Sequence, residues 1–359
     1  LDMDRRIIDY QQDEGFGYQE MRDDGQLKIA TYNVLFTARN KFLRWLLAPN
    51  TRYQNQIDAI LPEINADIIC LQEVRKEYLE MLNKSMIKDQ YQISAYEVGR
   101  ADKHFPIILS KIPFTELLMR DRTLYALFEW KKTPFIVVNV HLNMLGRNKR
   151  MRAHEVRNIE QTLRSISESA DNEEQRQQIQ KALDSDNIFV MGDFNMHKPL
   201  ENLTFEEFEY SDVWLEKHSH LQGHTFDGTT NKLLRTMSPF DNRRLRLDRI
   251  ILKTKSNFAP KDIQIFGNRQ IQTTWSERWL PLFPSDHYGL ISSFELRDSP
   301  RPNPFALPFY KEFKALPQNR TGYRNGAMII LYSFTAFLAI SVVLVFGSYK
   351  LIKFVGKLF

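Results

Sequence analysis

The sequence predicts an α/β sandwich, in which two packed sheets are covered by helices. Short apolar runs that end in polar residues recur along about the first 300 residues, and such runs are typical of buried strands. Amphipathic helical segments separate only some of these runs, so several neighbouring strands must pair antiparallel. The chain has 359 residues, of which 43% are hydrophobic, and can therefore bury a substantial core. This composition excludes a disordered protein.

Local patterns of apolar residues give the individual elements. Strands are expected at residues 27–34, 68–71, 91–98, 107–110, 124–130, 135–140, 187–191, 245–252 and 290–296. Helices are expected at 52–65 and 76–85, and over 150–169 continuing into 172–182. The strands at 124–130 and 135–140 leave no room for a helix between them, so we expect them to be antiparallel neighbours.

Charge and cysteine content narrow the class of protein. The formal net charge is +5, but Lys350, Lys353 and Lys357 lie in the last ten residues. Charge therefore gives little support for a nucleic-acid partner. The single cysteine, Cys70, lies in an apolar run, which excludes internal disulfide bonds and favours a reducing compartment. We interpret it as a buried core thiol.

A second strong pattern lies near the end of the chain. Residues 327–349 carry no formal charge over 23 positions, which at about 1.5 Å per residue exceeds the roughly 30 Å hydrocarbon layer of a bilayer. They predict a transmembrane helix that anchors the chain, with a buried helix of a soluble core as the alternative. Basic residues flank both ends, which leaves the orientation open. A mitochondrial and an endoplasmic reticulum membrane both fit.

Polar residues stand where the predicted strands end. They are Asn33, Glu73, His141, Asp193, Asn195, Asp248, Asp286 and His287. Strand ends can meet at one edge of a sheet, so we expect these side chains to form one site. A buried carboxylate at Glu73 would be costly without a cation, and a divalent ion such as Mg²⁺ would supply one. The alternative is a strand-end glutamate that faces solvent.

The other polar residues suggest proton transfer and phosphate binding. Asp193 beside Asn195 suits the orientation of a water and a hydrogen bond to a phosphoryl oxygen, with an Asp-rich turn as the alternative. Asp248 could hold one nitrogen of His287 and fix its protonation state. His141 could act as a second acid for the leaving group. No serine stands in the context of a nucleophile elbow, so a Ser-His-Asp triad is not predicted.

The segments that carry these residues are ATYNV, LQEV, VNVHL, MGDFN, RLDRI and PSDHYGL. In this order they resemble the endonuclease/exonuclease/phosphatase superfamily over about residues 27 to 297. The resemblance implies a four-layer α/β sandwich and cleavage of phosphate esters that depends on Mg²⁺, or on Mn²⁺ in its place. We therefore expect a metal-dependent phosphoric ester hydrolase.

The resemblance also implies a role for each residue. Glu73 would be a metal ligand with Asp286 near the metal, and Asn33 would bind phosphate. Asn195 would bind phosphate as well. Asp193 would orient or activate the water.

The remaining roles concern the transition state and the leaving group. His287 would stabilise the transition state with help from Asp248. His141 would lie close to the leaving group. Basic residues near His141 and Asp248 could form a phosphate-attracting rim, with solvated faces as the alternative. They are Arg147, Lys149, Arg150, Arg152, Arg243, Arg244 and Arg246.

The domain organisation follows from these patterns. We expect an N-terminal extension at 1–26, a catalytic domain at 27–297, a proline-rich tether at 298–326, the transmembrane helix at 327–349 and a short basic tail at 350–359. The tether holds five prolines, a density that is typical of an extended segment.

Three functions stay open at this point. The first is a membrane-anchored Mg²⁺-dependent phosphodiesterase, and the second is a phosphodiesterase specific for sphingolipids or phospholipids. The third is an accessory subunit of a larger membrane complex, mitochondrial for example, that reuses the enzyme fold. The motifs look most like the branch that contains tyrosyl-DNA phosphodiesterase 2 and are also similar to neutral sphingomyelinases. The substrate is therefore a phosphate ester whose source, nucleic acid or lipid headgroup, is undecided.

Overall fold

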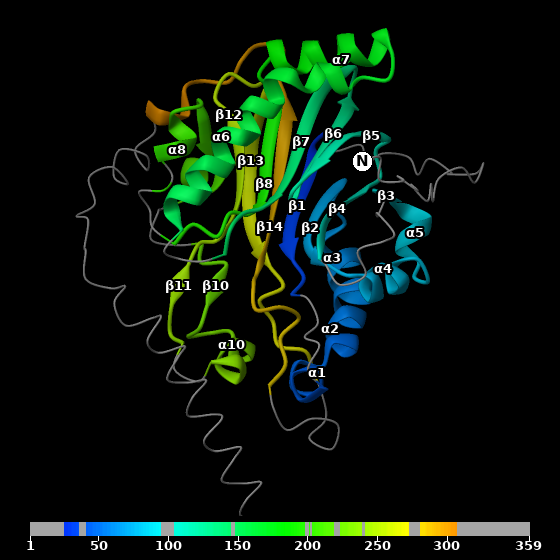
Figure 1. The fold of residues 1–359 in the computed structure, drawn as a ribbon, viewed down its shortest axis with the longest axis vertical. Helices are drawn as coiled ribbons and strands as arrows, with labels where there is room; N and C mark the ends of the chain where they lie inside the picture. The colour runs from blue at the N-terminus through cyan, green and yellow to red at the C-terminus, as the bar shows by residue number, and fades with distance from the viewer. Residues whose placement is uncertain are drawn as a thin grey trace, which may run out of the picture.

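Two mixed six-stranded sheets pack face to face and are flanked by helices on their outer faces (Figure 1). This computed structural model describes residues 25–35, 41–94, 104–144, 148–197, 201, 203–218, 223–238, 241–272 and 281–306. The predicted α/β sandwich is confirmed.

The first sheet has the strand order β13-β14-β1-β2-β4-β3. Its strands are β1 (Leu27–Asn33), β2 (Ile68–Val74), β3 (Gln92–Ile93), β4 (Phe105–Ser110), β13 (Phe258–Phe266) and β14 (Gly289–Leu296). The central pair β1 and β2 is parallel, whereas the other neighbours are antiparallel.

The second sheet has the strand order β5-β6-β7-β8-β12-β9. Its strands are β5 (Phe114–Arg120), β6 (Thr123–Trp130), β7 (Thr133–His141), β8 (Ile188–Asp193), β9 (Tyr210–Asp212) and β12 (Asp248–Lys253). Here β7 and β8 are parallel, and β6 and β7 are antiparallel as predicted. A separate two-stranded ribbon joins β10 (Phe226–Asp227) to β11 (Arg244–Leu245).

The helices are α1 (Lys41–Leu47), α2 (Pro49–Asn55), α3 (Leu61–Ile64), α4 (Lys76–Leu82), α5 (Ile87–Gln90), α6 (Lys149–Ser165), α7 (Glu173–Asp184), α8 (Leu203–Glu206), α9 (Val213–Lys217) and α10 (Lys232–Met237). Short 3₁₀ turns lie at Ile166–Ser169 and Pro304–Ala306. The helices α2 to α5 lie on the side of β1, β2 and β4, and α6 and α7 lie on the side of β7 and β8 (Figure 1).

Three buried apolar clusters hold these layers together. The cluster between the sheets is rich in phenylalanine and includes Phe135 of β7, Phe189 of β8 and Phe294 of β14. A second cluster packs α6 and α7 on the second sheet, and a third packs α2 to α5 on the first. Burial of these side chains drives the layering, because each sheet must cover two apolar faces.

The predicted helix at 52–65 is continuous but not uniform. A π-helical stretch, Gln56–Ile60, joins α2 to α3. Pro62 follows it, and a proline inside a helix lacks the N–H donor and clashes with the carbonyl one turn earlier. The wider π turn avoids that conflict.

Several predicted elements need correction. The strand expected at 245–252 is two strands, β11 and β12, which belong to different sheets. The helix expected from 150 to 182 is broken into α6, a 3₁₀ turn and α7. Only Gln92–Ile93 of the strand expected at 91–98 forms a described strand, and residues 95–98 lie outside the described residues.

The membrane prediction falls outside the described residues. Residues 327–349, the tether from residue 307 and the N-terminal extension up to residue 24 all lie there, as does the basic tail. Within the part of the chain that the structure describes, none of the helices has the length and apolar character needed to cross a bilayer. The transmembrane helix therefore stays a prediction.

Candidate active site

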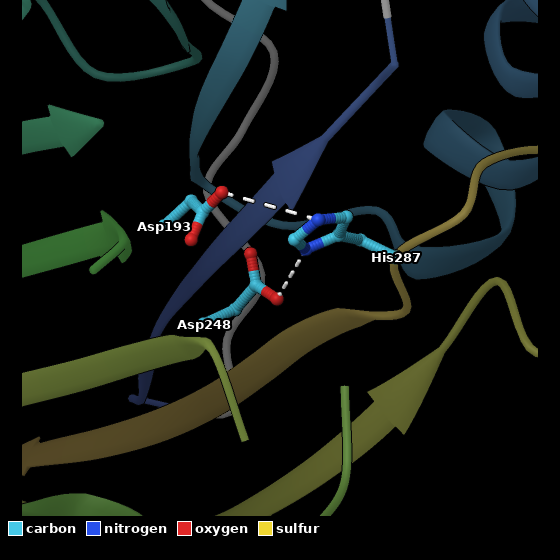
Figure 2. A group of neighbouring side chains, drawn as sticks. All are labelled: Asp193, Asp248 and His287. Carbon is cyan, nitrogen blue, oxygen red and sulfur yellow. Dashed lines mark hydrogen bonds and ion pairs between the residues drawn. The ribbon is translucent and has the colours of Figure 1, made fainter. Parts of the chain in front are cut away.

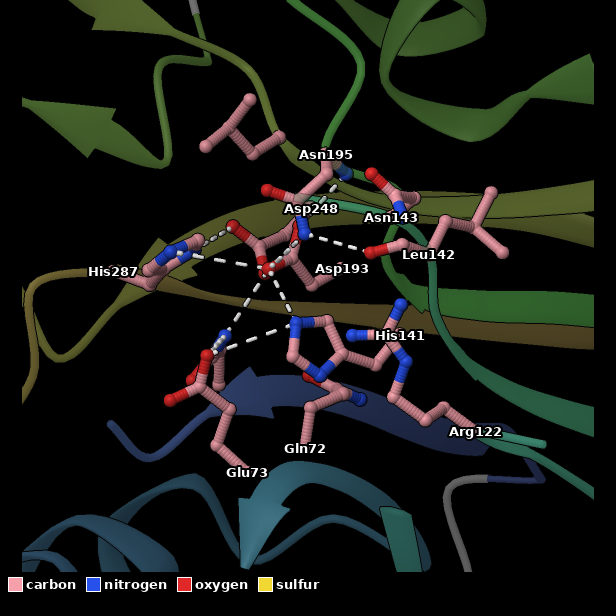
Figure 3. A network of polar contacts seen from close by, with 12 residues as sticks. Gln72, Glu73, Arg122, His141, Leu142, Asn143, Asp193, Asn195, Asp248 and His287 are labelled. Atoms are coloured by element: carbon pink, nitrogen blue, oxygen red, sulfur yellow. Dashed lines mark hydrogen bonds and ion pairs between the residues drawn. The ribbon is translucent and has the colours of Figure 1, made fainter. Parts of the chain in front are cut away.

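The strand register brings the predicted polar residues to one edge of the two sheets. In the second sheet, Asp193 at the end of β8 is paired with His141 at the end of β7 and with Asp248 at the start of β12. In the first sheet, Asn33 at the end of β1 is paired with Gln72 of β2. Neighbouring strand ends from both sheets thus supply the side chains (Figure 3).

Unusual backbone conformations aim two of these side chains. Glu73 has a φ of 62° at an irregularity in the pairing of β2 with β4, and Asn195 has a φ of 50°. Residues other than glycine seldom adopt positive φ, and such strain is concentrated at functional sites. At Gly192, with a φ of 143°, a Cβ atom would lie 2.0 Å from the carbonyl oxygen of Val140. Only glycine lets β8 approach β7 so closely.

Asp193 is the centre of the hydrogen-bond network. Its Oδ2 accepts from the side-chain amides of Asn33 and Asn195, both at 3.1 Å. Its Oδ1 accepts from the backbone N–H of Asn195 at 2.8 Å. Burial raises the pKa of Asp193 to about 7, and the carboxylates of Asp248 and Glu73 add to the rise, although His287 and the Asn195 N–H oppose it. This carboxyl group can therefore exchange a proton near neutral pH.

Glu73 is joined to Asp193 through Asn33. The Asn33 amide nitrogen lies 3.2 Å from Oε1 of Glu73, and its oxygen accepts from the backbone N–H of Leu35 at 3.0 Å. The Leu35 contact fixes the orientation of the amide, so its N–H groups face the two carboxylates. Asn33, which is expected to bind phosphate, thus contacts two carboxylates in this structure.

Asp248 and His287 form a buried pair. Nδ1 of His287 lies 2.8 Å from Oδ2 of Asp248, and its Nε2 lies 3.9 Å from Oδ2 of Asp193 (Figure 2). Burial alone would lower the pKa of His287, but Asp248, Asp193 and Asp286 together raise it well above the usual value. His287 is therefore an imidazolium ion at neutral pH. The hydroxyl of Thr225 accepts the backbone N–H of Asp248 at 3.0 Å.

His141 enters the same cluster from β7. Its Nε2 lies 3.6 Å from Oε1 of Glu73 and 3.6 Å from Oδ2 of Asp193 (Figure 3). Burial lowers the pKa of His141 well below the usual value, and Arg122 and His104 lower it further. The short distances to carboxylates are therefore made by a neutral ring, which carries a single N–H.

Asp286 lies beside the cluster rather than inside it. Its Oδ1 is 3.3 Å from the hydroxyl of Ser285, which donates to the carbonyl of Asn33 at 2.7 Å. Ser285 was not predicted as a site residue, and it links the loop before β14 to the end of β1. Asp286 is 9% exposed, which leaves its carboxylate accessible from the site.

Arg52 of α2 and Gln56 of the π-helical stretch hold in place the segments that follow β1 and precede Ser285. The sequence analysis did not predict this role. Nη1 of Arg52 donates to the carbonyls of Val34 and Pro284, both at 3.1 Å. Nε2 of Gln56 donates to the same Pro284 carbonyl at 2.6 Å. Both side chains are fully buried. An arginine in an amphipathic helix is a signal, but the shared partner Pro284 is more than 200 residues away along the chain.

A polar link between the two sheets was also missed. Nε2 of Gln72 donates to Oδ1 of Asn139 at 2.8 Å, and Nδ2 of Asn139 donates to the carbonyls of Leu71 at 3.1 Å and Ile107 at 2.8 Å. Gln72 belongs to the first sheet and Asn139 to the second. Both residues interrupt apolar runs, which was a usable signal in the sequence.

The donor set fits a metal ion. Within the described ranges, Asp193, Asp248 and His287 have potential ligand atoms that all lie within 4.8 Å of one another, but His287 cannot ligate a metal ion while it is protonated. This group differs from the predicted ligands Glu73 and Asp286, although Glu73 joins Asp193 through Asn33. Oδ1 of Asp248 is buried without a hydrogen-bond partner among the described residues. A cation would compensate this orphaned oxygen and the excess of carboxylates.

The predicted basic rim is wrong for two of its members. Arg152 is fully buried and its Nε donates to Glu201 at 2.8 Å, and Arg246 lies 2.6 Å from Asp212. These arginines neutralise internal carboxylates because unpaired buried charges are costly. Arg243 and Arg244 pair with Asp241 and Asp227. Lys149 and Arg150 are exposed, and Arg147 lies outside the described residues.

The fold and the matched family are those of phosphoesterase-type hydrolases. The profile of the Endonuclease/Exonuclease/phosphatase family matches residues 30–287. The chain belongs to this family. No curated protein matches the sequence significantly.

Solved structures share the fold at low identity. D. rerio TDP2 complexed with single strand DNA product has a TM-score of 0.55 and 18% identity, and the match covers 76% of this chain and 100% of that one. Truncated Caenorhabditis elegans TDP2 has a TM-score of 0.52 and 19% identity over 75% and 98% of the two chains. A mannosyl-6-phosphatase of Bacteroides thetaiotaomicron has a TM-score of 0.53 and 14% identity over 75% and 99%.

Proposed function

We propose that the chain is a metal-dependent phosphodiesterase that uses water as the nucleophile. One observation carries the proposal. Asp193, whose pKa is about 7, lies within reach of Asn33, Asn195 and two histidines of opposite protonation state. Such a set can position a water, take its proton and stabilise a phosphoryl group that gains negative charge.

Mg²⁺, with Mn²⁺ as its substitute, is the ion that best fits oxygen ligands. Glu73 and Asp286 would hold it, as the family resemblance implies, and Asp193 is a third candidate. When bound, the ion would neutralise charge on the phosphate and lower the cost of attack. It would also offset the burial of Asp193 and the repulsion from Asp248 and Glu73, which together raise the pKa of Asp193.

The proton transfers belong to residues of this chain. Ionised Asp193 takes the proton of the attacking water, and the backbone N–H of Asn195 holds its other oxygen in place. Imidazolium His287, held by Asp248, donates a hydrogen bond to a phosphoryl oxygen and offsets its charge. His141 is neutral, so we propose it as a hydrogen-bond donor near the leaving group rather than as the acid suggested by the sequence.

The amides of Asn33 and Asn195 are proposed to contribute to phosphate binding. In the absence of substrate each contacts Asp193. A bound phosphate oxygen would have to replace one present acceptor, because both N–H groups of each amide are engaged. Asn33 donates to Glu73 and Asp193, and Asn195 donates to Asp193 and the carbonyl of Leu142. The same amides would then orient the base and the phosphate together.

The substrate is proposed to be a phosphodiester reached from a membrane. The neighbour solved with single strand DNA product supports a nucleic-acid ester, and the uncharged segment 327–349 favours a lipid headgroup or another substrate close to the bilayer. Hydrolysis of a small soluble diester should be tested first, before experiments that distinguish a nucleic-acid ester from a lipid headgroup.

Replacement of Glu73 tests the proposed function. We expect Glu73→Gln to lower kcat/KM for bis(p-nitrophenyl) phosphate by at least 100-fold, because the exchange removes a charge from the metal site. EDTA should abolish the activity and Mg²⁺ should restore it. Glu80→Gln, at an exposed position of α4, is the matched control and should keep full activity. Hydrolysis that survives both EDTA and Glu73→Gln would refute the proposal.

A further inference from the structure

A cavity of about 740 Å³ opens beside His141. Its walls are the start of β4, the turn between β5 and β6, the end of β7 and one face of α6. His141 borders it, and the same ring reaches Glu73 and Asp193 through Nε2. The cavity is therefore the immediate neighbour of the proposed reaction site, on the side of His141. Its volume is within the range of sites for small molecules.

The cavity is lined by three arginines, Arg75, Arg120 and Arg122, and by two carboxylates, Asp121 and Glu155. We call it the arginine cavity. An arginine keeps its charge at all physiological pH values and binds phosphate oxygens through several N–H groups at once. The arginine cavity thus carries permanent positive charge on the wall that faces an incoming anion.

The two carboxylates leave the three arginines with a formal excess of one positive charge. Glu155 lies 4.0 Å from Arg122, at the limit of an ion pair, and its Oε2 accepts the backbone N–H of Asn143 at 3.0 Å. Burial raises the pKa of Glu155, and the backbone N–H of Asn143 and the guanidinium of Arg122 oppose the rise. Arg120 is exposed at the end of β5. Its guanidinium can turn toward a ligand without a change in the fold.

The remaining walls suit the uncharged part of a small ester. The rings of His104 and His141 lie 5.5 Å apart between centroids, and burial lowers the pKa of His104 to about 4. Phe105 and Tyr125 add apolar surface to the lining. A sugar or polyol ring could pack there while an anionic group contacts the arginines.

We infer that the arginine cavity is a subsite for a second phosphate group on the substrate. The inference rests on the proposed function for the location of the first, scissile phosphate. The shared chemistry is an alcohol or sugar that carries two phosphate groups. It can come from a nucleotide chain or from a phosphorylated lipid headgroup.

Binding in the presence of EDTA tests the inference without metal or turnover. Isothermal titration calorimetry would compare thymidine 3′,5′-bisphosphate with thymidine 5′-monophosphate, and inositol 1,4-bisphosphate with inositol 1-monophosphate. The full chain would be used, in detergent if required. The variants are Arg120→Gln and the double variant with Arg122→Gln. Arg176→Gln, at an exposed position of α7, is the control.

We expect the bisphosphate of one pair to bind at least tenfold more tightly than its monophosphate. The double variant should lose that gain but keep the affinity for the monophosphate, and Arg176→Gln should change neither. The pair that shows the gain identifies the source as nucleotide or headgroup. If the double variant unfolds, the exposed single variant Arg120→Gln should still reduce the gain.

Equal affinities within both pairs, or a gain that survives the double variant, would overturn the inference. Failure of the proposed function would give a different experimental result. In that case bis(p-nitrophenyl) phosphate is not hydrolysed with Mg²⁺, whereas the difference between mono- and bisphosphate binding persists.

Discussion

Asp193 and His287 show how a few contacts set the protonation of a whole site. Asp193 is buried among carboxylates and its pKa rises to about 7, whereas His287 is held charged by three neighbouring carboxylates. Burial keeps His141 neutral by lowering its pKa, and Arg122 and His104 lower that pKa further. The two histidines therefore carry different charges within one cluster, and this division of roles follows from their neighbours.

The pair formed by Asp248 and His287 should make stability depend on pH. The pKa of folded His287 lies above its unfolded value of about 6.5, so the stabilisation is complete below pH 6.5 and is lost as the pH rises through the folded pKa. Asp248→Asn removes the main cause of that rise. We expect the variant to lose on the order of 2 kcal/mol at pH 6 and less at pH 9.

Urea unfolding at pH 6, 7.5 and 9 measures this dependence, and a proton NMR titration of the His287 ring measures its pKa directly. Asp184→Asn, at an exposed position of α7, is the control and should show no trend with pH. An equal loss at all three pH values would contradict the assignment of charge to His287.

Gly192 should tolerate no side chain. In Gly192→Ala the new Cβ would overlap the carbonyl of Val140, so β7 and β8 must separate and carry His141 away from Asp193. We expect a loss of more than about 3 kcal/mol in the free energy of unfolding and at least a 100-fold loss of activity. Thermal unfolding and a diesterase assay measure both quantities.

Gly25→Ala is the comparison for Gly192→Ala. Its φ is 66°, but the nearest atom to a new Cβ is the flexible Lys131 Nζ at 3.4 Å. We expect a cost of about 1 kcal/mol and full activity. If both variants cost the same, the positive φ of Gly192 rather than the close approach of β7 and β8 would explain why this position requires glycine.

At the scale of elements, the helix that begins with α2 positions the active-site loops. Arg52 and Gln56 reach the carbonyl of Pro284, and Arg52 also reaches those of Val34 and Leu35. The carbonyls of Val34 and Leu35 lie just after β1, and the carbonyl of Pro284 lies just before Ser285, Asp286 and His287. One buried turn of helix therefore fixes two catalytic segments that are distant in the sequence.

Removal of the guanidinium should disturb both segments. Arg52→Met leaves buried carbonyls without donors, and we expect a loss of about 3 kcal/mol in stability together with a lower kcat. Arg44→Met, in an exposed part of α1, should have little effect on either quantity. Thermal unfolding and kcat for bis(p-nitrophenyl) phosphate would be measured side by side. A variant with wild-type stability would show that the hydrogen bonds of Arg52 do not stabilise the fold.

The elements also show what sequence patterns can and cannot predict. The strands that carry Glu73 and Asp193 are apolar runs with a polar end, and their location was predictable for that reason. Strand β13 was missed because Pro260, Lys261 and Asp262 interrupt its apolar pattern, and an edge strand tolerates such residues. The bonds of Arg52 and Ser285 were not predictable, because they join segments that only the tertiary fold brings together.

At the scale of the whole molecule, residues 327–349 are predicted to attach the sandwich to a membrane. The prediction rests on an uncharged segment of 23 residues. We expect the full chain to stay with the membrane fraction after extraction with alkaline carbonate, and a chain that ends at residue 306 to be released. Recovery of the full chain in the soluble fraction would remove the membrane from the proposal.

The link between Gln72 and Asn139 crosses the interface between the two sheets, and the catalytic residues lie on both sides of it. Neither sheet holds a complete reaction centre. During folding, activity should therefore return only with the final docking of the two halves, later than secondary structure. Any agent that binds across the seam, such as a substrate or an ion, would resist their separation and slow degradation of the protein.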